Sequence, residues 1–125
     1  MRSAQLRTPL GLVGALLVSG LACSSMTSPT VTTPASDVLI NKGASTLGSS
    51  AFAPNPFTVS LTGAKAGKVT WANADYTSTY SGTTGTTHHL VSDTGVWDSG
   101  AMGPAAVSSF TFATAGSYPY HCSIH

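Results

Sequence analysis

Hydrophobic residues alternate with polar residues in several short runs between residue 57 and the C-terminal end of this sequence. These runs lie at residues 57–61, 69–71, 88–91, 110–112 and 118–122. A period of two residues is typical of β-strands with one buried face, and glycine and proline separate the runs. No stretch outside the first 22 residues holds a helical period. The pattern therefore predicts an all-β fold, an antiparallel β-sandwich of short strands.

The N-terminal segment has the features of an export signal. Arg2 and Arg7 precede an apolar run at residues 10–18 and small residues that end at Cys23. The apolar run is too short to remain in a bilayer as a spanning helix, so we predict a signal peptide at residues 1–22. A cysteine at this place resembles the lipidated residue of bacterial lipoproteins. The alternatives are ordinary cleavage nearby or an incidental cysteine.

Composition divides the remainder into a linker and one domain. Residues 23–36 are rich in Ser, Thr and Pro, so we expect a flexible tether there and a folded domain at residues 37–125. After residue 22 the chain has three lysines and four aspartates, which gives a formal charge of −1. This charge excludes the basic surface of a nucleic-acid-binding protein. Charged residues are 7% of the chain, against about 25% in typical soluble domains, which favours an exported β protein.

The twelve residues that precede His88 do not show the alternation of hydrophobic and polar residues. Residues 76–87 are mostly Thr, Ser and Gly and show no hydrophobic period, so we expect a long loop that is mobile or functional. Tyr76 and Tyr80 are expected to pack at the base of this loop.

The C-terminal residues combine ligands that suit a transition metal. Cys122 and His125 form a C-x-x-H spacing, which allows one tight turn to present a thiolate and an imidazole to the same ion. If Cys23 is lipidated, Cys122 has no disulfide partner in an oxidising compartment, and metal binding explains such a thiol. His88 or His89, at the start of an alternating run, would supply a second imidazole. One thiolate and two imidazoles are typical of electron-transfer copper sites.

The chain resembles the cupredoxins, the small blue copper proteins related to plastocyanin, pseudoazurin and amicyanin. The resemblance rests on Val-Thr-Trp-Ala-Asn at residues 69–73 with Asp75, on Tyr-Pro-Tyr-His-Cys-Ser-Ile-His at residues 118–125, and on residues 52–54, 57–59, 88–93, 97–100 and 109–112. These segments occur in the family's order between residues 51 and 125. The resemblance implies a Greek-key β-sandwich with one copper ion at one end and a role as a one-electron carrier.

The resemblance also assigns individual residues. It implies that His88, rather than His89, binds copper together with Cys122 and His125. His121 resembles a common neighbour of the cysteine, and the alternation along the strand turns it away from the metal. Asn73 matches a residue whose side chain links the ligand loops, although it could equally be a turn residue that ends its strand. We expect Met102 to be an apolar surface residue rather than a ligand.

Two departures from the family concern the C-terminal end. Cupredoxins usually carry a Met ligand shortly after the last histidine and then a closing strand, whereas this sequence ends at His125. We expect a sequence that is truncated at its C-terminal end; the alternative is a site without that axial ligand in a sandwich that lacks its last strand. The loop at residues 76–87 is also longer than is usual in the family.

The expected protein is a monomer that exchanges electrons with redox proteins by transient docking, for which apolar residues near 101–106 are candidates. Its expected location is the periplasm, or the outer side of the inner membrane through a lipid on Cys23. The alternatives are a copper chaperone or storage protein and a copper-free β-sandwich of the cell surface. An enzyme is not expected, because four histidines are too few for a multicopper site and no catalytic motif is present.

Overall fold

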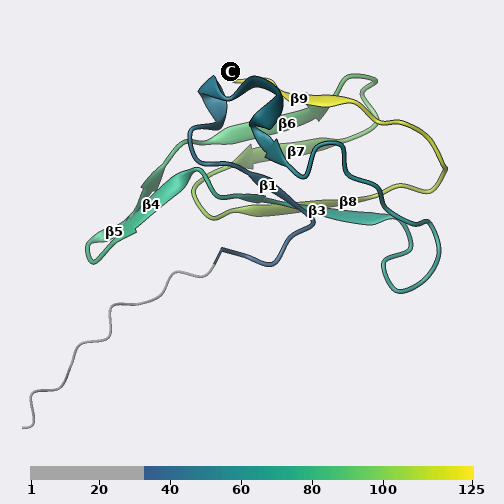
Figure 1. Cartoon of the computed structure of the whole chain (residues 1–125), viewed down its shortest axis with the longest axis horizontal. Helices are drawn as coiled ribbons and strands as arrows, with labels where there is room; N and C mark the ends of the chain where they lie inside the picture. Colours follow the sequence, from purple (N-terminus) through teal and green to yellow (C-terminus); the bar gives the residue numbers. More distant parts are fainter. Residues whose placement is uncertain (1–32) are drawn as a thin grey trace, which may run out of the picture.

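The computed structural model of the protein describes residues 33–125, which form β-strands and two short 3-10 turns. Two larger sheets, with strand orders β2-β1-β3-β8 and β7-β6-β9, lie as two layers, and a hairpin of β4 and β5 extends from one end (Figure 1). The elements are β1 (Val38–Ile40), the 3-10 turns η1 (Ala44–Thr46) and η2 (Gly48–Ser50), β2 (Phe52–Ala53), β3 (Lys68–Asn73), β4 (Tyr76–Thr79), β5 (Gly82–Gly85), β6 (His88–Ser92), β7 (Asp98–Met102), β8 (Val107–Thr111) and β9 (Tyr120–Cys122). The predicted all-β class is confirmed.

One strand pair departs from the predicted antiparallel arrangement. β1 runs parallel to β3, with Val38 opposite Trp71, while every other pair within residues 33–125 is antiparallel. Parallel neighbours need a long connection that returns the chain to the same end of the sheet. Residues 41–67, which contain η1, η2 and β2, provide this connection.

The hydrophobic core lies between the two layers. The indoles of Trp71 on β3 and Trp97, just before β7, stack with ring centroids 4.5 Å apart. Tyr120 on β9 meets both rings, so aromatic side chains connect the layers. The buried apolar side chains are those of Val38, Ile40, Ala44, Ala51, Val69, Trp71, Leu90, Trp97, Met102 and Phe112. The runs at 69–71, 88–91 and 110–112 contribute to this core as the alternation predicted.

The alternating run at residues 57–61 does not form a strand. Phe57, Val59 and Leu61 are half-buried against the core, and Thr58 and Ser60 are exposed, so the faces agree with the pattern. None of the strands within residues 33–125 pairs with this segment. The prediction of a strand here is wrong, because alternation specifies which side chains are buried but does not supply a neighbouring backbone.

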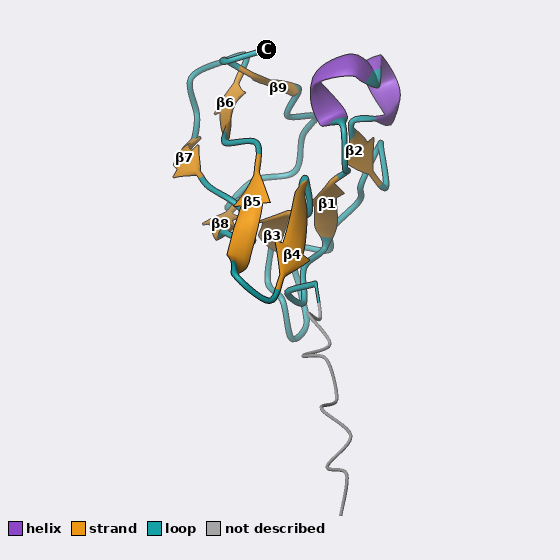
Figure 2. Cartoon of the chain, turned by 90° about the vertical axis from the view of Figure 1, so that its left-hand side faces the viewer, coloured by secondary structure: helices purple, strands orange, loops and turns teal. Residues whose placement is uncertain are grey.

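The predicted loop at residues 76–87 is instead largely a β-hairpin. β4 and β5 pair in antiparallel register, and the hairpin projects beyond the layers at one end of the molecule (Figure 1). In the view from that end, the hairpin lies in front of β3 and β8 (Figure 2). Gly85 lies so close to the chain that an added Cβ would be 2.3 Å from the Asp75 carbonyl oxygen, which explains glycine at this position. Tyr80 is 98% exposed at the tip and does not pack at the base as expected, whereas Tyr76 is half-buried.

The N-terminal predictions concern residues that lie mostly outside this part of the chain. The signal peptide at 1–22, Cys23 and most of the tether precede residue 33, and residues 33–36 have no regular secondary structure. Among the helices of residues 33–125, none has the length and apolar content needed to cross a membrane.

Candidate metal centre

The two neighbouring histidines at the start of β6 point to opposite sides of the sheet. Burial alternates along β6, so His88, Leu90 and Ser92 are buried, while His89 and Val91 are more accessible. His88 is 1% exposed. The structure therefore places the His88 imidazole, and not that of His89, in the interior between the layers.

Cys122 reaches the same region from the neighbouring strand. β9 pairs with β6 so that Cys122 lies opposite Leu90, and both side chains face the core. After Cys122 the chain turns. A hydrogen bond of 2.8 Å from the Ser123 backbone N–H to the His89 carbonyl oxygen stabilises this turn. The turn places the His125 ring 4.8 Å from the ring of His88, at the start of β6.

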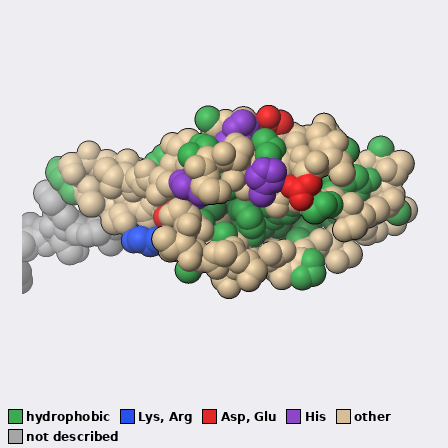
Figure 3. All heavy atoms as spheres, turned by 90° about the horizontal axis from the view of Figure 1, so that it is seen from above, with side chains coloured by type: hydrophobic (Ala, Val, Ile, Leu, Met, Phe, Trp, Pro, Cys, Tyr) green, Lys and Arg blue, Asp and Glu red, His purple; other side chains and the backbone are tan. Residues whose placement is uncertain are grey.

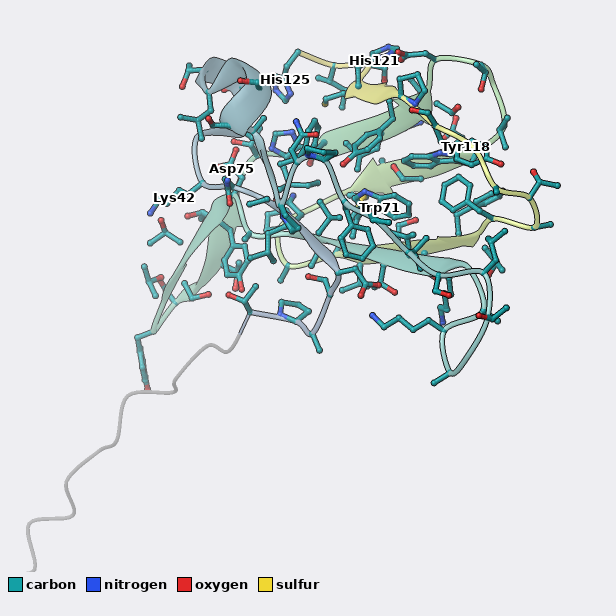
Figure 4. The ribbon with its side chains drawn as sticks, turned by 45° about the vertical axis from the view of Figure 1, so that its right-hand side comes forward. Lys42, Trp71, Asp75, Tyr118, His121 and His125 are labelled. Carbon is teal, nitrogen blue, oxygen red and sulfur yellow. The ribbon has the colours of Figure 1, made fainter. Side chains whose placement is uncertain are left out.

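These three side chains bring one sulfur and two ring nitrogens together. Cys122 Sγ lies 3.6 Å from His88 Nδ1 and 3.3 Å from His125 Nδ1. The candidate ligand atoms of the three residues all lie within 4.8 Å of one another. His88 is buried, Cys122 is half-buried and His125 is exposed, so the group opens to solvent on one side. Figure 4 shows His125 at this end of the molecule, beside the 3-10 turns.

Asp75 lies behind His88, on the side of the ring that faces away from Cys122. Its Oδ2 is 3.0 Å from His88 Nε2, and its Oδ1 accepts a hydrogen bond of 2.7 Å from the Gly43 backbone N–H. Burial acts to raise the pKa of Asp75, but the bonds from Gly43 and His88 outweigh it, and the pKa is lower than its ordinary value. Asp75 is therefore a buried, ionised carboxylate in contact with a candidate ligand.

Asn73 connects the segments around His88. Its side-chain nitrogen donates to the carbonyl oxygens of Thr86, Met102 and Gly103 at 2.8, 2.9 and 3.0 Å. Its side-chain oxygen accepts the Asp75 backbone N–H at 2.9 Å. The resemblance implied a link between the ligand loops. These bonds join the approach to His88 to the turn after β7, and none of the bonds found within residues 33–125 joins Asn73 to the turn at Cys122.

Met102 is buried, which contradicts the prediction of a surface residue. It ends β7 directly opposite His88 and is only 1% exposed. Because residues directly opposite in an antiparallel pair share a face, its side chain points into the core like that of His88. The expectation of a surface residue was wrong because the glycine and proline that follow Met102 suggested a turn one residue too early.

The outer face of the β7-β6-β9 sheet carries two more histidines, each beside an aspartate. His89 Nε2 is 2.5 Å from Asp98 Oδ1, and His121 Nδ1 is 2.6 Å from Asp93 Oδ1. Figure 3 shows histidine and acidic side chains next to each other on this face. Hydrogen bonds from the Gly100 backbone and from His89 lower the pKa of Asp98. His121 thus lies away from Cys122 Sγ, on the side that the alternation predicted.

The group of His88, Cys122 and His125 could hold a metal ion. A thiolate and two imidazoles are donors that suit zinc, copper and other transition metals, and Cys122 forms no disulfide within residues 33–125. Comparisons of this chain with protein-family models, with curated proteins and with solved structures found no match.

Sequence reasoning gave Asp75 no role at the site. Asp75 follows the strand that contains Asn73 by two residues and precedes His88 by thirteen, so no local spacing links the carboxylate to the imidazole. The available signal was an aspartate two residues after Asn73, a polar residue that ends its strand. Only the paths of β3 and β6 bring the two side chains together.

Proposed function

We propose that this protein binds one copper ion through His88, Cys122 and His125 and carries single electrons, as a type 1 copper protein. The observation that supports the proposal best is the convergence of one thiol and two imidazole nitrogens within 4.8 Å. His88 and Cys122 are 34 residues apart in the sequence, so the fold rather than local spacing unites them.

The donor set favours copper among the transition metals. A thiolate stabilises the monovalent ion and imidazoles suit both oxidation states, so three such donors in a trigonal arrangement are typical of electron-transfer copper sites. Zinc accepts the same donors in a tetrahedral site, so the experiment below distinguishes the two metals. The proposal includes a Greek-key cupredoxin-like sandwich, which the two layers and the mostly antiparallel pairing support.

The protein's contribution is to hold the ligands in fixed positions. Copper, when bound, supplies the redox chemistry by alternating between its monovalent and divalent states. The ladder between Leu90 and Cys122 and the bond from Ser123 to the His89 carbonyl keep the thiol and the last turn in place. Both imidazoles must be neutral and the thiol deprotonated to bind a metal, so metal affinity decreases in acid.

Electron exchange with a partner would take place at the open side of the centre. His125 is exposed, and its neighbour Ile124 is 53% exposed, so a partner can approach the ligand group closely there. Electron-transfer encounters bury little area, and we expect a weak, transient interface with redox proteins. Export by residues 1–22, with or without a lipid on Cys23, completes the proposal and places the protein in the periplasm or on the outer side of the inner membrane.

The test is the visible spectrum of the purified protein after loading with Cu(II). We expect one copper ion per chain and an intense sulfur-to-copper absorption band, with reversible one-electron voltammetry. Cys122→Ser should abolish the band, whereas Cys23→Ser, which changes the other cysteine, should keep it. A blue Cys122→Ser variant, or preferential retention of zinc, contradicts the proposal. Copper binding without reversible voltammetry would indicate storage or delivery of copper instead.

A further inference from the structure

Asp75 occupies a position that can control what His88 binds. The Asp75 side chain is 9% exposed, and its ion-pair partner is the imidazole of His88, which is 1% exposed. One ring nitrogen, Nε2, is 3.0 Å from the carboxylate, and the other, Nδ1, is 3.6 Å from Cys122 Sγ. The imidazole thus lies between a buried carboxylate and the candidate metal position.

The carboxylate determines which ring nitrogen carries the proton. An ionised carboxylate can only accept hydrogen bonds, so Nε2 must donate to Asp75. In the neutral ring this leaves Nδ1 with a free lone pair directed towards Cys122. The Gly43 backbone N–H, 2.7 Å from Asp75 Oδ1, holds the carboxylate in this orientation. Metal-binding histidines commonly donate their second ring N–H to such a group, which fixes the ring and makes it a stronger ligand.

The carboxylate also changes the charge of the centre. Cys122 as a thiolate and Asp75 contribute one negative charge each, and the two imidazoles are neutral, so the four groups total −2. A divalent ion brings the total to zero, whereas a monovalent ion leaves −1. An uncompensated charge in a buried site is costly. None of the ion pairs found within residues 33–125 joins Lys42 to Asp75, and the exposed Lys42 ammonium group donates to the Thr77 hydroxyl instead.

We infer that Asp75 is a positioning residue of the metal centre, which keeps the His88 proton on Nε2 and raises the affinity of the site for a divalent ion relative to a monovalent ion. This inference rests on the proposed function, since it assumes that His88, Cys122 and His125 bind a metal. It adds that the two charge states of the ion are bound unequally because of one carboxylate outside the ligand set.

The experiment compares Asp75→Asn with Asp98→Asn in the full-length protein. Both variants remove one aspartate that contacts a β6 histidine, but Asp98 is exposed and contacts His89. The dissociation constants of Zn(II), a divalent ion without redox chemistry, and of Cu(I) are measured for each protein. Asp75→Asn should weaken Zn(II) binding about 10–100-fold and Cu(I) binding much less. Asp98→Asn should change either constant less than about fivefold, because exposed ion pairs are weak.

A second measurement needs neither a variant nor a metal. The ¹⁵N shifts of His88 in the metal-free wild-type protein at neutral pH should show the tautomer with the proton on Nε2. A proton on Nδ1, or equal changes of the Zn(II)/Cu(I) affinity ratio in the two variants, overturns the inference and leaves metal binding intact. If the wild-type protein binds neither ion, the proposed function and the charge preference both fail, and the NMR result still decides the role of Asp75 in orienting His88.

Discussion

His88 and His89 are adjacent in sequence, and each contacts an aspartate, yet their surroundings differ completely. The His88–Asp75 pair is buried, with side chains 1% and 9% exposed, whereas the side chains of the His89–Asp98 pair are 32% and 58% exposed. His88 directs its second ring nitrogen, Nδ1, to Cys122 Sγ. By contrast, the residue opposite His89 in the sheet is Ala101. Two residues of the same type therefore differ in their surroundings, and only His88 belongs to the candidate metal centre, because of the face of the strand that each occupies.

The comparison shows that a histidine–carboxylate contact alone does not indicate a metal site. In water, such a pair is screened and contributes little, because both groups exchange solvent contacts for each other. In the interior the same pair is protected from solvent, so its charge and its proton position affect every neighbouring group. The inner side of β6 is the place where the carboxylate can influence a bound ion.

The largest expected effect comes from replacing His88, the buried histidine of this comparison, with His89 as its control. His88→Gln keeps a group that can donate to Asp75 but loses the ring nitrogen, so metal affinity should fall by more than the about 10–100-fold typical of groups around the ligands. His89→Gln should change the affinity by less than about fivefold. Isothermal titration with Zn(II) measures both. Equal losses in the two variants would show that the face of β6 does not determine which histidine binds the metal.

A smaller effect is expected on the free energy of unfolding when the Asn73 side chain, which connects the segments around His88, is removed. Asn73→Ala removes a fully buried amide that donates to three carbonyl oxygens, and each buried group left unsatisfied costs about 1–3 kcal/mol. The free energy of unfolding of the metal-free protein, measured in urea, should decrease by about 3 kcal/mol or more. Asn55→Ala is the matched control, because the exposed Asn55 amide makes one bond to the Ser49 carbonyl and its loss should cost less than about 1 kcal/mol. A similar loss in both variants would contradict a special role for Asn73.

The smallest expected effect is the acid dependence of stability. Hydrogen bonds keep the pKa of Asp75 below its ordinary value of 3.8 in the folded protein. The carboxylate therefore stabilises the fold above pH 3.8, and this contribution is lost as the pH falls through the lower folded pKa. Between pH 7 and 3, the unfolding free energy of Asp75→Asn should decrease less than that of the wild type. Asp98→Asn should follow the wild type more closely, since solvent screens Asp98. A reversed order of the two variants would contradict the comparison.

The sequence by itself determined those features that depend on short-range spacing. The two-residue alternation predicted β3, β6 and most of the core, and it correctly predicted opposite faces for neighbouring residues, such as His121 and Cys122 on β9. The spacing between Cys122 and His125 suggested a shared site because three residues fit one tight turn. These inferences hold because the direction of a side chain in a strand follows from local backbone geometry.

Only the tertiary structure decided which distant segments meet. It placed β1 parallel to β3, left residues 57–61 without a strand partner, formed a hairpin from a stretch with no hydrophobic period, and buried Met102 opposite His88. It also placed Asp75 against His88, a contact that no motif records. The physical reason is that burial and strand pairing depend on the backbone and side chains of other segments, whereas sequence periodicity describes only one segment at a time.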